Sequence, residues 1–157
     1  MGDHYPCELM IGGEIPRDVA EELCQRISQQ GVSLDWGDAD FTPTCPNQLL
    51  EALDEDGLLT LVDDQARDGE MYELEEFLQA RHIYYVRHSS GHYEFTESFE
   101  WLGPEGQGGC LSSQEMPVIP LIDIQKALTL SDEDALRMIR ELVATNSPPT
   151  LPPLVIK

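Results

Sequence analysis

Short apolar stretches separated by turn residues predict a set of β-strands in the first hundred residues. Each stretch is four to six residues long and is rich in branched or aromatic side chains, which is typical of strands that are buried on at least one face. The predicted strands are Cys7–Ile11, Val32–Trp36, Leu58–Val62 and Ile83–His88. A further strand ends at Trp101, because aromatic and polar residues alternate from Tyr93 onward, and Ser89–Gly91 would connect it to its neighbour as a hairpin.

Apolar residues at helical spacing predict helices between these strands. The clearest helix follows Pro16, carries an apolar stripe that includes Leu23 and Ile27, and stops at Gly31. A short helix opens at Thr44 or Cys45, and a third surrounds Leu74 and Phe77. The pattern therefore alternates strand and helix up to the hairpin.

The C-terminal third has a different pattern. Gly103–Gly109 contains four glycines and a proline, which predicts a mobile loop, and Val118–Leu128 is apolar without a clear period. Ser131, with Asp134 three residues later, resembles a capping box at the start of a helix. Four prolines in residues 146–157 predict an extended tail.

This order of elements predicts an α+β fold, with a single mixed sheet that has helices packed on one face, a C-terminal helix and an extended Pro-rich tail. Each helix has an apolar stripe that must be buried, and a sheet face is the natural partner for it. We expect residues 1–145 to form one domain and residues 146–157 to form the tail. The strand order does not follow from the pattern.

The charge of the chain narrows the functional classes. Thirty acidic residues against nine basic ones give a formal charge of −21. This surplus disfavours direct binding to nucleic acid or to an anionic membrane. With no apolar run of about 20 residues and no signal-peptide pattern at the N-terminus, the expected location is cytoplasmic.

The carboxylates are concentrated in the middle of the chain. Residues 35–76 hold fourteen acids and the single cation Arg67, whereas residues 106–157 hold six acids and four cations. Such a segment could occupy a basic surface on a partner protein, because complementary charge gives fast and specific association. The nine residues that we predict to bind the partner are Asp38, Asp40, Asp54, Glu55, Asp56, Asp63, Asp64, Asp68 and Glu70.

Two simpler explanations of the acidity stay open. Asp and Glu are favoured in the first turn of helices, so some of these acids serve only the local structure. In addition, an acid-rich chain with only two lysines is what a salt-adapted proteome would contain, and that origin predicts acidity on every face.

Metal-binding patterns in the chain are incomplete. A calcium loop counted from Asp64 would use Asp68, Gly69 and Glu75, but Ala66 occupies its third position, and Asp54–Gly57 fits the loop less well. His88 and His92 flank the predicted hairpin turn, yet two ligands do not make a zinc site. Cys7, Cys24, Cys45 and Cys110 have no C-x-x-C spacing, and we interpret them as reduced thiols.

The chain also lacks the local motifs of common enzymes. It has neither a G-x-S-x-G elbow nor a Gly-Lys-Ser/Thr phosphate loop, so we expect no catalytic activity and no cofactor. The leading hypothesis is an acidic, non-enzymatic interaction protein, and its sharpest form is a nucleic-acid mimic that blocks a basic groove of a DNA- or RNA-handling protein. The alternatives are a housekeeping subunit of a larger assembly from a salt-adapted or acid-biased proteome, and a weak divalent-cation binder.

Overall fold

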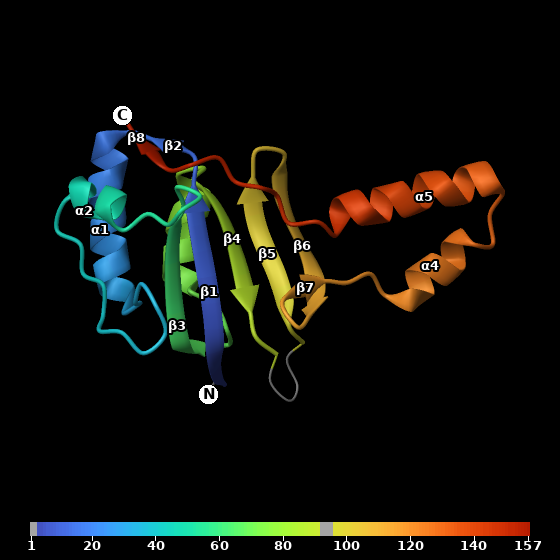
Figure 1. The fold of residues 1–157 in the computed structure, drawn as a ribbon, viewed down its shortest axis with the longest axis horizontal. Helices are drawn as coiled ribbons and strands as arrows, with labels where there is room; N and C mark the ends of the chain where they lie inside the picture. The colour runs from blue at the N-terminus through green and yellow to red at the C-terminus, as the bar shows by residue number, and fades with distance from the viewer. Residues whose placement is uncertain (1–2, 92–95) are drawn as a thin grey trace.

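The fold is α+β and is built on a six-stranded sheet (Figure 1). A computed structural model describes residues 3–91 and 96–157. The strands lie in the order β3-β1-β4-β5-β6-β7, and each neighbouring pair in this sheet is antiparallel. The strands are β1 (His4–Gly12), β2 (Glu14–Ile15), β3 (Leu59–Arg67), β4 (Tyr84–Ser89), β5 (Ser98–Gly103), β6 (Gly106–Ser113), β7 (Met116–Pro117) and β8 (Val155–Ile156). The helices are α1 (Arg17–Gln30), α2 (Pro46–Glu51), α3 (Tyr72–Ala80), α4 (Leu121–Ala127) and α5 (Asp132–Thr145).

The main core lies between one face of the sheet and helices α1 and α3. Leu9 and Ile11 alternate along the central strand β1 and are fully buried in this core. Leu23 and Ile27 enter it from α1, and Leu78 enters it from α3. The alternation of β1 and the helical stripe of α1 therefore bury the same layer from its two sides, as the apolar pattern predicted.

The other face of the sheet carries a smaller apolar cluster. Val86, Trp101 and Cys110 come from β4, β5 and β6, and Leu151 of the C-terminal tail covers them. The β6 glycines make this packing possible, because a Cβ atom at Gly108 would lie 2.6 Å from the indole ring of Trp101. The predicted mobile loop at Gly103–Gly109 is therefore wrong: Gly103 ends β5, and β6 begins at Gly106.

Several predicted elements are confirmed with their end signals. Helix α1 ends at Gly31, which has φ of 76° and adopts the left-handed conformation that glycine allows. Helix α5 begins after Ser131, whose hydroxyl accepts a hydrogen bond from the Asp134 N–H at 3.3 Å. The ambiguous apolar segment forms the short helix α4.

The predicted strand at Val32–Trp36 is absent from the described part of the chain. Ser33 forms only an isolated bridge to Val62, and the segment then turns away from the sheet. Val32 is buried, but Leu34 and Trp36 are exposed, so no second inward-facing position holds the segment against the core. Tyr93 and Phe95 of the predicted hairpin, like His92, lie outside the described residues, although β4 and β5 pair as expected.

The C-terminal tail is extended and is bonded to the body of the protein. Pro152 O accepts a hydrogen bond from Gly13 N, Val155 N donates to Gly13 O, and both distances are 2.9 Å. The tail ends in β8, which pairs in parallel with β2 in a separate two-stranded sheet. It thus crosses the end of the main sheet and returns the chain to α1 (Figure 1).

Within the described residues, no helix is long and apolar enough to cross a membrane.

Candidate functional site

The predicted acidic residues gather along β3, which is an edge strand of the main sheet. One side of β3 pairs with β1, and the other side meets the loop after α1 at the Ser33–Val62 bridge. Nine residues at about 3.3 Å each give this strand a length of roughly 30 Å. We call the nine predicted residues the acidic edge: Asp63 and Asp64 lie in β3, Asp54, Glu55 and Asp56 precede it, and Asp38 and Asp40 lie in the loop beside it. Asp68 and Glu70 follow β3 in a turn that leads away from the edge, where Glu70 lies near Arg87 of β4.

The middle of the acidic edge is a small hollow between β3 and the loop of residues 31–40. Asp38, Asp40, Asp63 and Asp64 line it, together with Trp36. Asp35 also lines the hollow, although it was not among the nine predicted residues. Its volume of about 260 Å³ is below the roughly 300–1,000 Å³ of small-molecule pockets. The shape therefore suits an inserted side chain better than a free metabolite.

Local hydrogen bonds hold the loop side of this hollow. Ser33 Oγ donates to Asp38 O at 3.0 Å, and Phe41 N donates to Val32 O at 2.7 Å. The Asp35 carboxylate accepts from the Trp36 N–H at 2.8 Å. These bonds fix the backbone and leave the carboxylates of Asp38 and Asp40 directed to solvent, where both side chains are exposed. The sequence pattern did not predict that this loop contacts β3.

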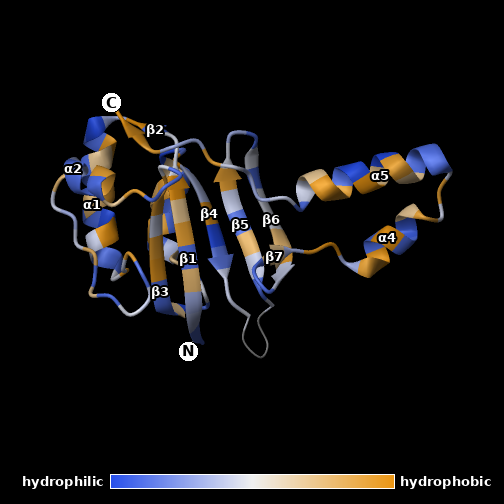
Figure 2. Ribbon diagram, viewed as in Figure 1, coloured by the Kyte–Doolittle hydropathy of each residue, from blue (hydrophilic) through white to orange (hydrophobic). Residues whose placement is uncertain are grey.

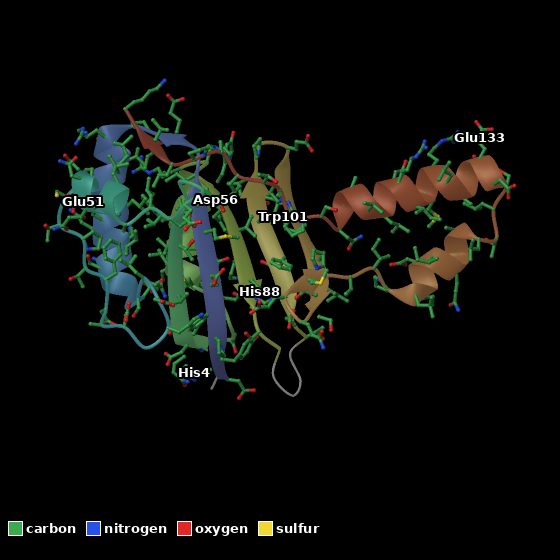
Figure 3. The ribbon with its side chains drawn as sticks, viewed as in Figure 1. His4, Glu51, Asp56, His88, Trp101 and Glu133 are labelled. Carbon is green, nitrogen blue, oxygen red and sulfur yellow. The ribbon has the colours of Figure 1, made fainter. Side chains whose placement is uncertain are left out.

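The turn before β3 has a structural role as well as a charge. Asp54 Oδ1 accepts from the N–H groups of Asp56 and Leu58 at 2.9 and 3.0 Å, and its Oδ2 accepts from Thr60 Oγ1 at 3.0 Å. Such a side-chain-to-backbone turn is a common use of aspartate. Asp56 marks this end of the strand in Figure 3, and His4, which pairs with Arg67, marks the opposite end.

The turn after β3 completes the acidic edge at the far end of the strand. A second hollow of about 410 Å³ is lined there by Asp68, Glu70, Tyr72 and Glu73, together with the cation Arg67. Asp68 has φ of 54°, a left-handed conformation that few residues other than glycine, asparagine and aspartate tolerate. The acidic edge is therefore a long band with a hollow in the middle and another at one end.

Most of these carboxylates have no cationic partner in the described part of the chain. Of the nine, only Glu70 forms an ion pair within the described residues, with its Oε1 3.7 Å from Arg87 Nη1. The cations that do form ion pairs neutralise acids elsewhere, such as Glu22 with Arg81 and Asp134 with Arg137. The negative electrostatic potential of the acidic edge is consequently not neutralised by ion pairs with cations of the same protein.

A different charged cluster is buried between α3 and β4, and sequence reasoning missed it. Glu75 Oε1 lies 3.0 Å from Arg87 Nη1, and both side chains are almost fully buried. Burial raises the pKa of Glu75 to about 7, while the Arg87 charge and the Met71 N–H oppose that rise. Two features of the sequence could have indicated this contact. Arg87 lies two positions after the inward-facing Tyr85 and therefore on the same face of β4, and Glu75 lies three positions before Leu78 on the same face of α3.

The Arg87 guanidinium of this buried cluster is shared among three carboxylates. Glu100 Oε2 lies 2.9 Å from Arg87 Nη2, in addition to the contacts with Glu70 and Glu75, while the buried Arg87 Nε has no hydrogen-bond partner among the described residues. Glu75 was the twelfth position of the calcium-like pattern, and its pairing with Arg87 removes it as a calcium ligand. Among residues 3–91 and 96–157, no group of three His, Cys, Asp or Glu side chains is arranged to hold a metal ion.

His88 joins a polar cluster on the open face of the sheet, near the hairpin (Figure 3). Its Nε2 lies 3.1 Å from Glu97 Oε2 and 3.2 Å from Ser112 Oγ, and Ser112 donates to the same Glu97 oxygen at 2.6 Å. In a catalytic Ser-His-acid triad, one imidazole nitrogen bonds the serine hydroxyl and the other nitrogen bonds the acid. Here both partners share one nitrogen, so the cluster ties β4, β6 and the segment before β5 together.

Comparison with known proteins gave no match: no family model fits the chain, and neither a curated protein nor a solved structure is significantly similar to it.

Proposed function

We propose that this protein is a non-enzymatic interaction module whose acidic edge binds a basic surface of a partner protein. The supporting observation is that Asp38 and Asp40, which lie more than twenty positions before β3 in the sequence, line one hollow with Asp63 and Asp64 of that strand. Their charges are almost all unpaired within the described residues. Binding by a cationic surface would compensate them, whereas DNA, RNA and anionic membranes would be repelled.

The concentration of unpaired charge supports the sharper form, a nucleic-acid mimic. Two of the nine carboxylates, Asp63 and Asp64, lie within the roughly 30 Å of β3, and the other seven lie in the segments next to it. A groove that binds a phosphate backbone would meet clustered negative charge on this surface, and the partner class that we propose is a DNA- or RNA-handling protein.

Trp36 would give this surface an anchor. It is 47% exposed at the hollow and is surrounded by carboxylates. Exposed tryptophans are over-represented among residues that dominate binding energy, and an arginine of the partner could stack on the indole ring. We place the interaction in the cytoplasm, where the four free cysteines would stay reduced.

The test is an affinity capture from the source cells with matched charge variants. The test variant neutralises three exposed acids of the edge, Asp38→Asn, Asp40→Asn and Asp64→Asn. The control variant neutralises three exposed acids elsewhere, Asp18→Asn, Glu21→Gln and Glu105→Gln. Both lose the same net charge, so any difference between them reports position and not total charge.

The proposal predicts one basic, nucleic-acid-binding protein that is captured by the wild type and the control variant and lost with the test variant. Duplex DNA should compete for that partner, and rising salt should release it. Equal capture by the test and control variants would overturn the role of the acidic edge. Capture that resists both salt and DNA would overturn the mimic.

A further inference from the structure

Residues 118–147 form a helical arm that extends away from the sheet. Helices α4 and α5 run beside each other, and only the ends of the arm connect it to β7 and to the C-terminal tail (Figure 1). Near its end, α5 lines a hollow with Trp101 through Ala144 and Ser147. Along the rest of the arm, no other element of the described chain covers α4 and α5 (Figure 1).

The arm has almost no core of its own. Ala127 and Ala135 are its only buried apolar residues within the described chain, and alanine buries little surface. Both helices contain hydrophobic residues, which are orange in Figure 2, and several larger apolar side chains in and beside the helices are exposed. Those at least one-third exposed in the arm are Val118, Leu121, Ile122, Leu128, Leu130, Leu136 and Val143. A short helix pair of this kind depends on packing for its stability, which predicts that something covers it.

The exposed residues are arranged as a helix-packing surface. Leu121 begins α4, and Leu128, which caps the end of that helix in helical conformation, lies seven residues later. Leu136 and Val143 of α5 are also seven residues apart, so each pair lies on one side of its helix. Leu121 and Leu128 are about 70% exposed, and Leu136 and Val143 about half exposed. Stripes at this spacing are typical of helices that pack along one another in bundles.

The charge of the arm points to a second copy of this chain as its partner. The arm holds five acids and three of the nine cations, a net charge of −2, which leaves −19 for the remaining residues. Asp132, Glu133 and Asp134 lie in the first turn of α5, where Arg137 pairs with two of them. The other arm charges are two acids and two cations: Asp123, Glu141, Lys126 and Arg140. A two-fold interface must complement itself, and this set is neutral.

The geometry of the arm also removes the main objection to self-association, which is repulsion between two strongly acidic bodies. Helix α5 has 14 residues and is therefore about 21 Å long. Two arms packed side by side in opposite directions would place the bodies at the two ends of the assembly. That separation exceeds the Debye length of about 8 Å at physiological salt, so the repulsion would be screened.

The exposed area is close to what a stable dimer needs. The exposed arm side chains are 36–70% exposed, so each offers on the order of 35–70 Å² of apolar surface, at roughly 100 Å² for a complete leucine-sized side chain. Together they expose on the order of 400 Å². A standard interface buries about 800 Å² per partner, of which about 65% is apolar in homodimers. Complete burial of the exposed arm side chains would supply about three-quarters of that apolar area, and the partly exposed Met138, Ile139 and Leu142 would add to it.

We propose that two copies of this protein associate through their arms, with the α4 and α5 helices of both forming a four-helix bundle. This interaction is separate from the acidic edge, because β3 and β7 lie at opposite edges of the sheet (Figure 1). A dimer would carry two acidic edges, one at each end.

The test is the molar mass in solution, measured by light scattering and by sedimentation velocity over a wide dilution series. The expected mass is twice 17.6 kDa, with dissociation only on strong dilution, and high salt should preserve or strengthen the dimer. Leu128→Glu and Leu136→Glu each place an acid in the interface twice by symmetry. We expect each to weaken the dimer by about 100-fold or more.

Leu50→Glu is the matched control, because Leu50 is 38% exposed on α2 and lies outside the arm. It should stay dimeric, and circular dichroism should show that all variants are folded, since the substituted positions are exposed in one copy. A wild type of 17.6 kDa at every concentration would overturn the proposal, even if the arm captured a different protein. Arm variants that are folded and still dimeric would overturn it as well.

Discussion

Glu75 and Arg87 form an ion pair inside the protein, with 3.0 Å between Glu75 Oε1 and Arg87 Nη1. The pair joins α3 to β4, and Glu75 Oε2 also accepts the Met71 N–H at the start of α3, at 2.9 Å. It therefore fixes the helix that covers the core against the strand beneath it. Removing a single partner would leave a charge in a site that water does not reach.

We predict that Arg87→Met destabilises the protein by about 3–5 kcal/mol, because Glu75 loses its buried partner. The double variant Arg87→Met with Glu75→Met should recover most of that loss, since two apolar side chains of similar length need no compensation. Urea unfolding of the single and double variants measures both values. A double variant that is as unstable as the single one would contradict the buried-pair explanation.

The same pair predicts a pH dependence. Burial raises the pKa of Glu75 to about 7, above its usual value of 4.5, so the folded state holds a proton that the unfolded state releases. This contribution to stability is complete below about pH 4.5 and is lost as the pH rises through about 7. It is at most about 3 kcal/mol.

Glu75→Gln isolates this effect from the general repulsion among thirty acids. Between about pH 4.5 and 7, the stability of the wild type should fall relative to the variant, as measured by unfolding at several pH values. A difference between the two proteins that does not change with pH would contradict the raised pKa.

The unpaired carboxylates of the acidic edge should repel one another at low salt. Asp38→Asn combined with Asp64→Asn should raise the melting temperature by about 1–3 °C at low ionic strength, and this gain should shrink in high salt. Glu105→Gln, remote from the edge, should change the melting temperature less. The prediction fails if the gain is the same at low and high salt.

The C-terminal tail should be essential for stability. Leu154 is 3% exposed and packs in the main core, so Leu154→Ala should cost about 2–4 kcal/mol. Its neighbour Val155 is 46% exposed, and Val155→Ala should change the unfolding free energy by less than about 0.5 kcal/mol. Equal effects in chemical unfolding would mean that the tail does not hold the core.

Cysteine reactivity gives a simple check of the packing. Cys45 is exposed at the start of α2, whereas Cys7, Cys24 and Cys110 are buried. Burial also raises the pKa of the Cys7 thiol, which lowers its thiolate fraction further. A thiol reagent should label one cysteine in the native protein and all four after denaturation.

The sequence was sufficient for features that depend on neighbouring residues. The stripe of α1 and its Gly31 stop, the Ser131 cap of α5 and the apolar run of β1 are local, and each appeared in the structure as predicted. The acidic segment was also visible from the sequence, because a count of charges needs no fold.

The tertiary structure determined which distant residues meet. Val32–Trp36 resembled a strand, but only contact with β3 could decide whether it joins the sheet, and it forms one bridge. The same contact brings Asp35, Asp38 and Asp40 to Asp63 and Asp64. The glycines of β6 resembled a loop because their partner, the Trp101 ring, lies on another strand.

By itself, the sequence determined the composition of the acidic surface, the helix ends and the main apolar faces, since these follow from residue type and spacing. Only the fold decided that Arg87 meets Glu75, that the proline-rich tail is bonded to Gly13, and that the apolar arm is left without cover. Contacts between distant segments arise when the whole chain buries its apolar surface at once. No local pattern contains that outcome.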